Sequence, residues 1–108
     1  MSTTQAGPVE VADNPDEERY EIRVGGELAG FTQYRPRPAG LALVHTEIDD
    51  RFEGQGMGSK LVSRTLDDVR RRGLAVLPIC PFVRSYVERH PEYLDLVPEE
   101  KRSSFGLG

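Results

Sequence analysis

This chain is poor in sulfur-containing residues, with one cysteine and two methionines, and it has no tryptophan. The single cysteine, Cys80, cannot form an internal disulfide, which excludes the small disulfide-stapled domains of secreted proteins. No stretch approaches the roughly 18 consecutive apolar residues that would suggest a membrane-spanning helix. Residues 1–5 also lack the basic and apolar regions of a signal peptide. We therefore expect a cytoplasmic protein without a membrane segment.

Basic residues are not in excess either, since the net charge is −4 at pH 7. Five of the 18 acidic residues lie within the first 18 positions, which hold no lysine or arginine. The remainder is nearly neutral, and its run Arg70-Arg71-Arg72 is most simply the solvated end of a helix, so we expect no nucleic-acid partner. The two histidines and the cysteine are widely separated and lack the spacing of zinc ligands. We therefore expect no metal.

Length and local composition predict one folded domain between two tails. A chain of 108 residues, of which 37% are hydrophobic, is of ordinary size for a single soluble domain. Residues 1–18 contain Pro8, Pro15 and small polar residues without an apolar period, and we expect a flexible acidic tail. Residues 19–97 are expected to form the domain. Residues 98–108 are polar and glycine-containing, and we expect a second flexible tail.

The first half of the domain predicts antiparallel strands. Residues 20–24 alternate apolar and polar side chains, as a half-buried strand does. The following Gly25-Gly26 suits the positive φ angles of a tight hairpin turn. The return strand covers about residues 27–35, and Gly30 within it indicates a bulge or the close approach of another backbone. Residues 41–48 begin as a nearly continuous apolar run, which is typical of a central strand.

The second half predicts a crossover. Apolar residues between positions 56 and 72 fall on one helical stripe, and Gly73 follows as a helix stop. Residues 74–79 form a second buried strand, and residues 82–89 a short helix that Pro91 ends. The fold class is therefore α+β. We expect a mixed four-stranded sheet, in which three antiparallel strands precede a β-α-β crossover, with two main helices.

A glycine-rich segment joins the central strand to the first helix, with the sequence Gly54-Gln55-Gly56-Met57-Gly58-Ser59-Lys60. Glycines let a backbone approach a ligand closely, and the free N–H groups at a helix N-terminus favour a phosphate. The spacing matches neither the P-loop of nucleotide hydrolases nor the fingerprint of dinucleotide-binding folds. By itself the segment predicts an anion site at a helix start, or a plain glycine-rich helix entry.

The surroundings of this segment are more specific. With His45-Thr46-Glu47 before it, and Cys80-Pro81-Phe82-Val83 and His90-Pro91-Glu92-Tyr93 after it, the segment resembles the acyl-CoA signature of the GNAT N-acetyltransferase superfamily. Residues 20–97 are similar to the minimal stand-alone GNAT proteins of the YjdJ type. One position departs from the family pattern: Glu53 stands where Arg or Gln usually precedes the first glycine. Arg51 satisfies the pattern only in a shifted register.

This resemblance implies a compact GNAT-like fold and the transfer of an acetyl group from acetyl-CoA to a primary amine. The acceptor would be a small molecule, or a lysine or N-terminus of a protein. The alternative function is an acyl-CoA-binding module without catalysis. The resemblance places the pantetheine arm against the backbone of Thr46, Glu47 and Ile48, and the pyrophosphate on the segment from Gly54 to Lys60. It also implies a monomer or a weak dimer.

The resemblance further implies catalytic roles, each with a structural alternative. Cys80 would lie near the acetyl group and either form a thioester, with His45 as its base, or pack as a small buried residue. His45 or Glu47 would otherwise accept a proton from the incoming amine, unless His45 is only structural. Tyr86 would protonate the departing thiolate or belong to the core.

Overall fold

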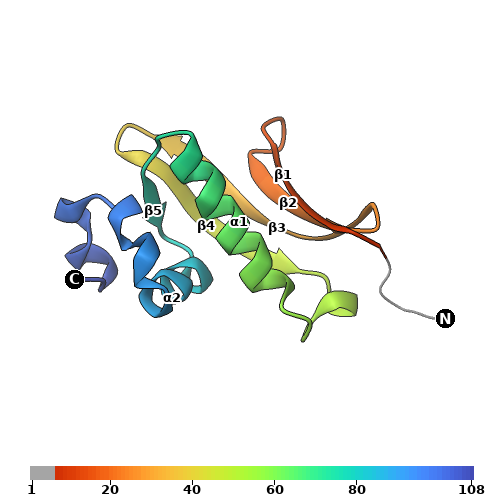
Figure 1. Ribbon diagram of the computed structural model, residues 1–108. Coiled ribbons are helices and arrows are strands. Elements are labelled where there is room, and N and C mark those ends of the chain that lie inside the picture. The colour runs from red at the N-terminus through yellow and green to blue at the C-terminus, as the bar shows by residue number, and fades with distance from the viewer. Residues whose placement is uncertain (1–6) are drawn as a thin grey trace.

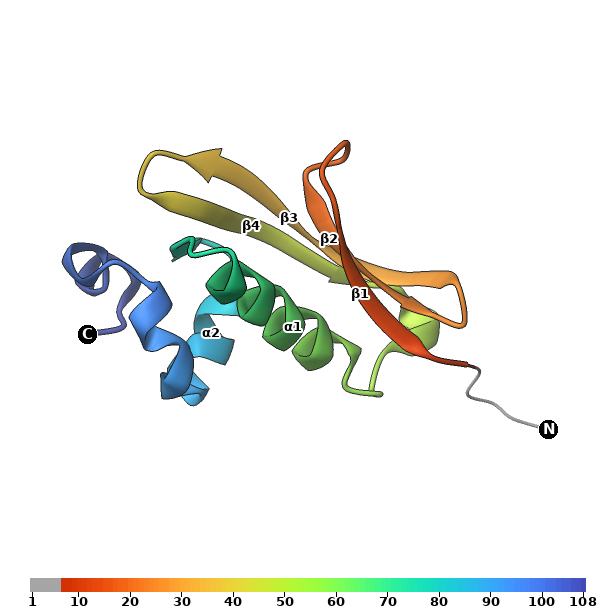
Figure 2. The ribbon, with the colours of Figure 1, turned by 45° about the horizontal axis from the view of Figure 1, so that its top comes forward.

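A computed structural model describes residues 7–108 and shows one five-stranded sheet in the order β1-β2-β3-β4-β5. Both α-helices lie on the same face of this sheet (Figures 1 and 2). The strands are β1 Val9–Asn14, β2 Arg19–Val24, β3 Glu27–Arg37, β4 Gly40–Ile48 and β5 Val76–Pro78. The helices are α1 Met57–Arg71 and α2 Pro81–Arg89, and four short 3-10 helices cover Asp50–Phe52, Pro91–Leu96, Glu99–Lys101 and Ser103–Phe105. The first four strands are antiparallel neighbours, and β4 and β5 are parallel. The predicted α+β class with one crossover is confirmed, but the sheet has five strands rather than the expected four, because residues 9–14 add one at its edge.

The β2–β3 hairpin has the turn that its glycines predict. Gly25 and Gly26 have φ angles of 57° and 85°, which are the positive values that a two-residue hairpin turn requires. Further along β3, the pairing with β2 shifts register, and Gly30 lies at this bulge. A Cβ atom on Gly30 would lie 2.4 Å from the carbonyl oxygen of Glu47. Glycine is therefore required where β3 and β4 approach each other.

A second irregularity divides β4 into two parts. Gln33 of β3 pairs with His45, but the next residue, Tyr34, pairs with Leu43, so Val44 is an extra residue in β4. Such a bulge changes which residues face each side of the sheet. Beyond it, Thr46 lies opposite the fully buried Thr32 on the side of the helices.

The core lies between the sheet and the two helices. The predicted stripe of α1 is confirmed, because its buried side chains are Met57, Leu61, Val62, Thr65, Leu66 and Val69. The short helix α2 contributes Val83, Tyr86 and Val87. Tyr20 and Ile22 of β2 belong to the same core and are almost completely buried. Because α1 follows β4 and packs on this face of the sheet, the start of α1 lies beside the end of β4.

The expected N-terminal tail is corrected by the structure. Residues 9–14 form strand β1, in which Val9 and Val11 pair with Val24 and Ile22 of β2. The carboxylate of Asp13 holds the strand in place, since it accepts a hydrogen bond from Tyr34 at 2.6 Å and pairs with Arg72, the residue directly after α1. Two valines between prolines are too short a pattern to predict a strand. The part of that prediction that concerns residues 1–6 lies outside the described residues.

The expected C-terminal tail is also corrected. Residues 99–101 and 103–105 form short 3-10 helices, and Phe105 and Leu107 pack partly buried against the core. The guanidinium of Arg102 donates to the carbonyl oxygen of Val97 at 3.0 Å and ties this segment to the domain. Isolated apolar residues among polar ones carry no helical period, so the sequence alone did not predict this packing.

Two fully buried threonines give a matched pair for a stability test. The hydroxyl of Thr65 in α1 has no hydrogen-bond partner among the described residues, whereas Thr32 bonds to Thr46 at 2.9 Å. An unpaired buried hydroxyl costs about 1 to 3 kcal/mol. Thr65→Val is therefore expected to raise the free energy of unfolding by about 1 kcal/mol, and Thr32→Val to lower it by a similar amount. Urea unfolding measures both, and a destabilising Thr65→Val would contradict the assignment.

Two partly buried carboxylates predict acid sensitivity. Burial favours the neutral form of Asp68, but the hydroxyl of Tyr20, at 2.6 Å, and two arginines outweigh burial and lower the pKa of that carboxyl. Burial likewise opposes ionisation of Glu21, and hydrogen bonds from Arg19, Asn14 and Arg23 lower its pKa below 4.5. Both carboxylates are therefore more acidic in the folded chain than in the unfolded chain.

Carboxyl groups with depressed pKa values stabilise the fold above their unfolded pKa, near 4, and lose that contribution as the pH falls through the folded value. The free energy of unfolding is therefore expected to be nearly constant from about pH 7 to pH 5 and to fall by roughly 1 to 3 kcal/mol below about pH 4. Urea titrations across this range measure it. Asp68→Asn should flatten the acid limb, and an unchanged stability at about pH 3 would contradict the assignment.

Candidate active site

The site begins where β4 and β5 separate. Their pairing ends at Leu43 and Pro78, and a last hydrogen bond runs from the Cys80 N–H to the Leu43 carbonyl at 2.8 Å. Beyond it, β4 has no partner strand on this side within residues 7–108. The Asp49 N–H donates to the Ala29 carbonyl at 2.8 Å, which sets the alternation of the β3–β4 ladder.

This alternation decides which backbone groups are free. Glu47 exchanges its backbone hydrogen bonds with Phe31 of β3, so Thr46 and Ile48 turn their N–H and C=O groups toward the open side. Such an edge can pair with an extended amide-bearing ligand as a neighbouring strand would. The separation of the two strands thus exposes a short, ready-made hydrogen-bonding edge.

The glycine-rich segment lies just beyond the end of this edge. Gly54 and Gly56 have φ angles of 79° and 75°, and a Cβ atom on either would meet nothing within 4 Å. No side chain caps α1, whose first helical hydrogen bond runs from the Lys60 N–H to the Gly56 carbonyl. The N–H groups of the three residues before Lys60 therefore have no acceptor within the helix. This start of α1 suits an anion, because its dipole and free donors point outward.

A hollow of about 300 Å³ connects the glycines to the end of β4, and its lining includes Ile48, Phe52, Glu53, Met57, Ser59 and Phe82. The Phe82 ring is 39% exposed and lies across the first turn of α1. A Cβ atom on Gly58 would come within 2.8 Å of the tip of that ring. The hollow thus offers an apolar wall beside an anion-binding turn, which fits a ligand with an uncharged arm and a phosphate group.

The two residues that complicated the sequence pattern have clear positions. The guanidinium of Arg51 contacts the carboxylates of Asp49 and Glu27, whose hydrogen bonds raise its pKa. Arg51 is therefore occupied, and the shifted register does not provide a phosphate ligand. Glu53 is exposed and lines the hollow, so it places a carboxylate near the proposed anion. Lys60 is exposed and pairs with no carboxylate among the described residues.

Cys80 lies at the separation of β4 and β5, immediately before α2. Its side chain is buried, with the residue 4% exposed, and its thiol donates to the hydroxyl of Thr46 at 3.4 Å. The Thr46 hydroxyl in turn bonds to that of Thr32 at 2.9 Å. The structure thus brings Cys80 against the open edge of β4, through a chain of two hydroxyls that sequence reasoning did not predict.

His45 and Glu47 lie on the opposite face of the sheet. Successive strand residues point to opposite faces, so both side chains point away from Thr46 and Cys80. The His45 imidazole contacts the Glu47 carboxylate at 2.9 Å and packs near Phe31, and both residues are exposed. The expected pairing of His45 with Cys80 is therefore wrong, because the sheet separates them. The expectation that Glu47 could orient the imidazole agrees with this contact.

Tyr86 packs within an aromatic cluster between α2 and the following turn. Its ring stacks on His90 at 4.0 Å between centroids and approaches Tyr93 at 6.0 Å, and the residue is buried. Tyr93 donates to Asp67 of α1 at 2.8 Å, while burial raises the pKa of its phenol to about 12. The Tyr86 hydroxyl makes no hydrogen bond to another described residue. Its ring packs as the structural alternative predicts, yet its hydroxyl has no other role within the fold.

Comparison with known protein families shows which family has this arrangement of strand edge, glycine segment and cysteine. Residues 19–96 match the family model described as GCN5-related N-acetyl-transferase. The chain belongs to this family. The match spans β2 to the turn after α2, so it includes the open strand edge, the glycine segment and Cys80. The family supports an enzyme of the N-acetyltransferase type, and the YjdJ-type subfamily stays a prediction.

Relatives share most of their length with this chain. It is 26% identical over 95 residues to Protein NATD1 of Mus musculus, covering 84% of this chain and 86% of that protein. Protein NATD1 of Gallus gallus is 25% identical over the same length. The fold resembles the solution structure of a GCN5-like protein from Staphylococcus aureus, with a TM-score of 0.62, 23% identity and coverage of 82% of this chain and 87% of that one.

Further features of this family member were not predicted as functional. Phe82 is one of them, and its only signal in the sequence is that an aromatic residue directly follows the Cys-Pro start of α2. Arg84 donates to the carbonyls of Pro78 and Ile79, at 3.4 Å and 2.7 Å, and so occupies acceptors just after β5. Within residues 7–108, no group of three acidic, histidine or cysteine side chains is arranged to hold a metal ion. No helix in this part has the length and apolar character needed to cross a membrane.

Proposed function

We propose that this protein binds acetyl-CoA and transfers its acetyl group to a primary amine. The observation that carries the proposal is the unpaired edge of β4 leading directly to the open glycine turn at the start of α1. An acyl-CoA has two amides in its pantetheine arm and a pyrophosphate beyond them, in the order that this edge and this turn provide. The family membership supports the same donor.

Different residues would contact different parts of the coenzyme. The backbone of Thr46 and Ile48 pairs with the pantetheine amides, and Glu47 between them holds the strand to β3. The N–H groups of the first turn of α1 receive the pyrophosphate, in a cradle formed by Gly54, Gln55, Gly56, Met57, Gly58, Ser59 and Lys60. The exposed ammonium of Lys60 adds a point charge. Phe82 packs against the arm where it passes the start of α1.

Direct transfer is the route that the geometry favours. The acceptor approaches from the sheet face that carries the exposed His45–Glu47 pair and reaches the thioester through the opening where β4 and β5 separate. The pair takes the proton of the acceptor's ammonium group, either directly or through water. The amine nitrogen then attacks the thioester carbonyl, and the new C–N bond forms as the C–S bond breaks. The Tyr86 hydroxyl protonates the departing thiolate and is reprotonated from solvent, to which the nitrogen releases its second proton. Cys80, beneath Thr46, contacts the acetyl group without bonding to it.

The covalent route through Cys80 has a direct test. Because the chain has a single cysteine, an acetyl adduct in the mass of the intact protein that neutral hydroxylamine removes, or that is missing from Cys80→Ser, is assigned to this thiol rather than to an amine. We expect no stable acetyl adduct and substantial activity in Cys80→Ser, since the thiol is buried and lacks a histidine base. An adduct that disappears on addition of an amine, and is absent from Cys80→Ser, would show that the thioester forms.

Turnover with a panel of amines tests the function itself. Loss of the thioester absorbance of acetyl-CoA is followed with small amines, lysine-containing peptides and peptides with free N-termini. The exposed sheet face beside His45 and Glu47 favours a protein lysine or N-terminus as the acceptor, because no element of residues 7–108 encloses it (Figure 2). Acetyl-CoA binding without turnover on any amine would leave the non-catalytic acyl-CoA-binding module as the function.

A further inference from the structure

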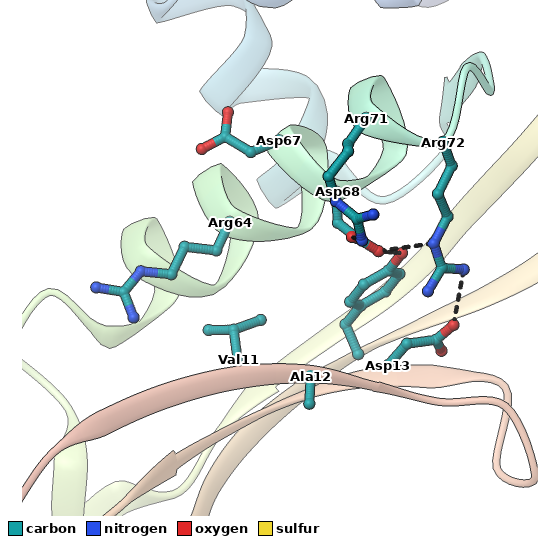
Figure 3. Close-up of a pocket in the computed structure, with 9 residues that line it drawn as sticks. Val11, Ala12, Asp13, Arg64, Asp67, Asp68, Arg71 and Arg72 are labelled. Atoms are coloured by element: carbon teal, nitrogen blue, oxygen red, sulfur yellow. Dashed lines mark hydrogen bonds and ion pairs between the residues drawn. The ribbon is translucent and has the colours of Figure 1, made fainter.

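A second hollow lies away from the candidate active site, between β1 and α1. It has a volume of about 520 Å³, and we call it the β1–α1 groove (Figure 3). Its walls are the edge of β1 on one side and the charged face of α1 on the other. The residues that matter for its chemistry are Val11, Asp13, Arg64, Asp68, Arg71 and Arg72.

The β1 wall is a free strand edge. The Gly25 N–H donates to the Pro8 carbonyl at 2.9 Å, which sets the alternation of the β1–β2 ladder. Alternate residues from Glu10 therefore pair with β2, while Val11 and Asp13 turn their N–H and C=O groups outward. Since β1 is the first strand of the sheet, no strand of residues 7–108 pairs with this edge. An extended segment could add to it as a sixth strand.

The carboxylates of the groove are already used. Asp68 accepts from Tyr20 at 2.6 Å and pairs with Arg71 and Arg72. Asp13 pairs with Arg72 at 3.0 Å and also accepts from a tyrosine of β3. Neither acid therefore has much capacity left for a ligand. Both instead hold the far end of the groove closed, which fixes the position of β1 over α1.

The unused groups are guanidinium donors. Arg64 reaches across to the Val9 carbonyl at 3.1 Å and has no carboxylate partner among the described residues. Asp67, one turn further along α1, also lines the groove, but it points away from β1 in Figure 3 and accepts from Tyr93. On the part of the α1 wall that faces the β1 edge, the remaining hydrogen-bonding capacity thus consists of positively charged N–H donors. Its chemical complement is a carboxylate.

We propose that the β1–α1 groove binds an extended acidic segment of a partner protein. The segment pairs with the outward N–H and C=O groups of Val11 and Asp13, and one of its carboxylates contacts Arg64. The backbone pairing provides affinity and the arginine selects acidic sequences. The groove is separate from the start of α1 that holds the anion site, so the two ligands bind independently.

Fluorescence anisotropy tests this with a labelled peptide of alternating valine and glutamate, and with its lysine counterpart as the comparison. The acidic peptide is expected to bind and the lysine peptide is not. Arg64→Gln should weaken binding by about tenfold, which corresponds to one charge-assisted hydrogen bond. Val11→Pro removes an outward N–H from the edge strand without breaking a β1–β2 hydrogen bond, although it also replaces a partly buried side chain, and it should weaken binding at least comparably. Arg37→Gln, at the exposed end of β3, is the matched control and should bind as the unchanged protein does.

Several outcomes would overturn the proposal. Equal binding of the acidic and lysine peptides, or an Arg64→Gln variant that binds normally, would show that the groove is not selective for acids. Self-association that Val11→Pro abolishes would show that a second copy of the chain occupies the edge. Thermal stabilisation by acetyl-CoA is measured on each variant and should be unchanged. A variant that loses both peptide binding and stabilisation by acetyl-CoA would be misfolded. Arg64→Gln changes only a side chain on the surface of α1, so it should keep the fold and still test the groove.

Discussion

A glutamate in place of Ser59 is expected to weaken acetyl-CoA binding by on the order of 100-fold while leaving the unliganded protein at least as stable. Ser59 is exposed at the third position of α1, and the first turn contains no acidic residue. A carboxylate there interacts well with the helix dipole and contributes about 0.3 to 1 kcal/mol of stability. The same charge repels a pyrophosphate held by the same turn. The affinity for acetyl-CoA, measured by isothermal titration, should therefore fall, while the free energy of unfolding, measured in urea, should stay the same or rise.

Two variants separate charge from shape and position. Ser59→Gln adds a similar volume without the charge and should weaken binding only slightly. Ser63→Glu puts the same charge one turn later, beyond the free N–H groups, and should have a small effect that salt screens. If Ser59→Glu bound acetyl-CoA as tightly as the unchanged protein, the pyrophosphate would not lie at the start of α1.

Gly30→Ala is expected to be among the most damaging single-atom additions to this fold. The added Cβ would lie 2.4 Å from the Glu47 carbonyl oxygen, 2.6 Å from Cδ1 of Ile48 and 3.1 Å from its Cα. Two of these three atoms are backbone and cannot rotate aside, so β3 and β4 must separate. We expect a loss of about 2 to 3 kcal/mol in the free energy of unfolding. Because Ile48 belongs to the proposed coenzyme edge, acetyl-CoA binding should weaken as well.

Gly26→Ala provides the comparison for this effect. Gly26 also has a positive φ angle of 85°, but a Cβ there meets nothing within 4 Å. The expected loss is about 1 kcal/mol, from the backbone conformation alone, with acetyl-CoA binding unchanged. Equal unfolding free energies for the two variants would show that the clash at Gly30 is relieved by movement elsewhere. Urea unfolding of both proteins at one pH decides between these results.

Structural features that depend only on neighbouring residues in the chain were predictable from the sequence. Gly25 and Gly26 require positive φ angles, and only a tight hairpin turn uses two in succession. The stripe of α1 follows from a period that any burial of one helix face would produce. The glycine segment was likewise visible as an anion site, because a strand, open glycines and a helix start need no distant partner. These features depend on neighbours in the chain.

Features that depend on distant partners were not predictable. The bulge at Val44 has no glycine or proline to mark it, yet it decides that Thr46 rather than His45 faces Cys80. The two-residue spacing of His45 and Glu47 correctly predicted that both side chains lie on the same face of the sheet, but it could not show which face of the sheet that is. Strand β1 was missed because Val9 and Val11 are stabilised by β2 and by the partners of Asp13, all far along the chain. The β1–α1 groove exists only because that strand is there.

A titration of isotope-labelled protein with coenzyme A, followed through its backbone amide NMR signals, locates the coenzyme on the strand edge and the helix start directly. We expect the largest shifts at the N–H groups of Met57, Gly58 and Ser59, and at Thr46 and Ile48 on the open edge of β4. Signals of Val11 and Asp13 in the β1–α1 groove should stay in place. Shifts confined to that groove, or none at millimolar coenzyme, would contradict the proposed coenzyme site.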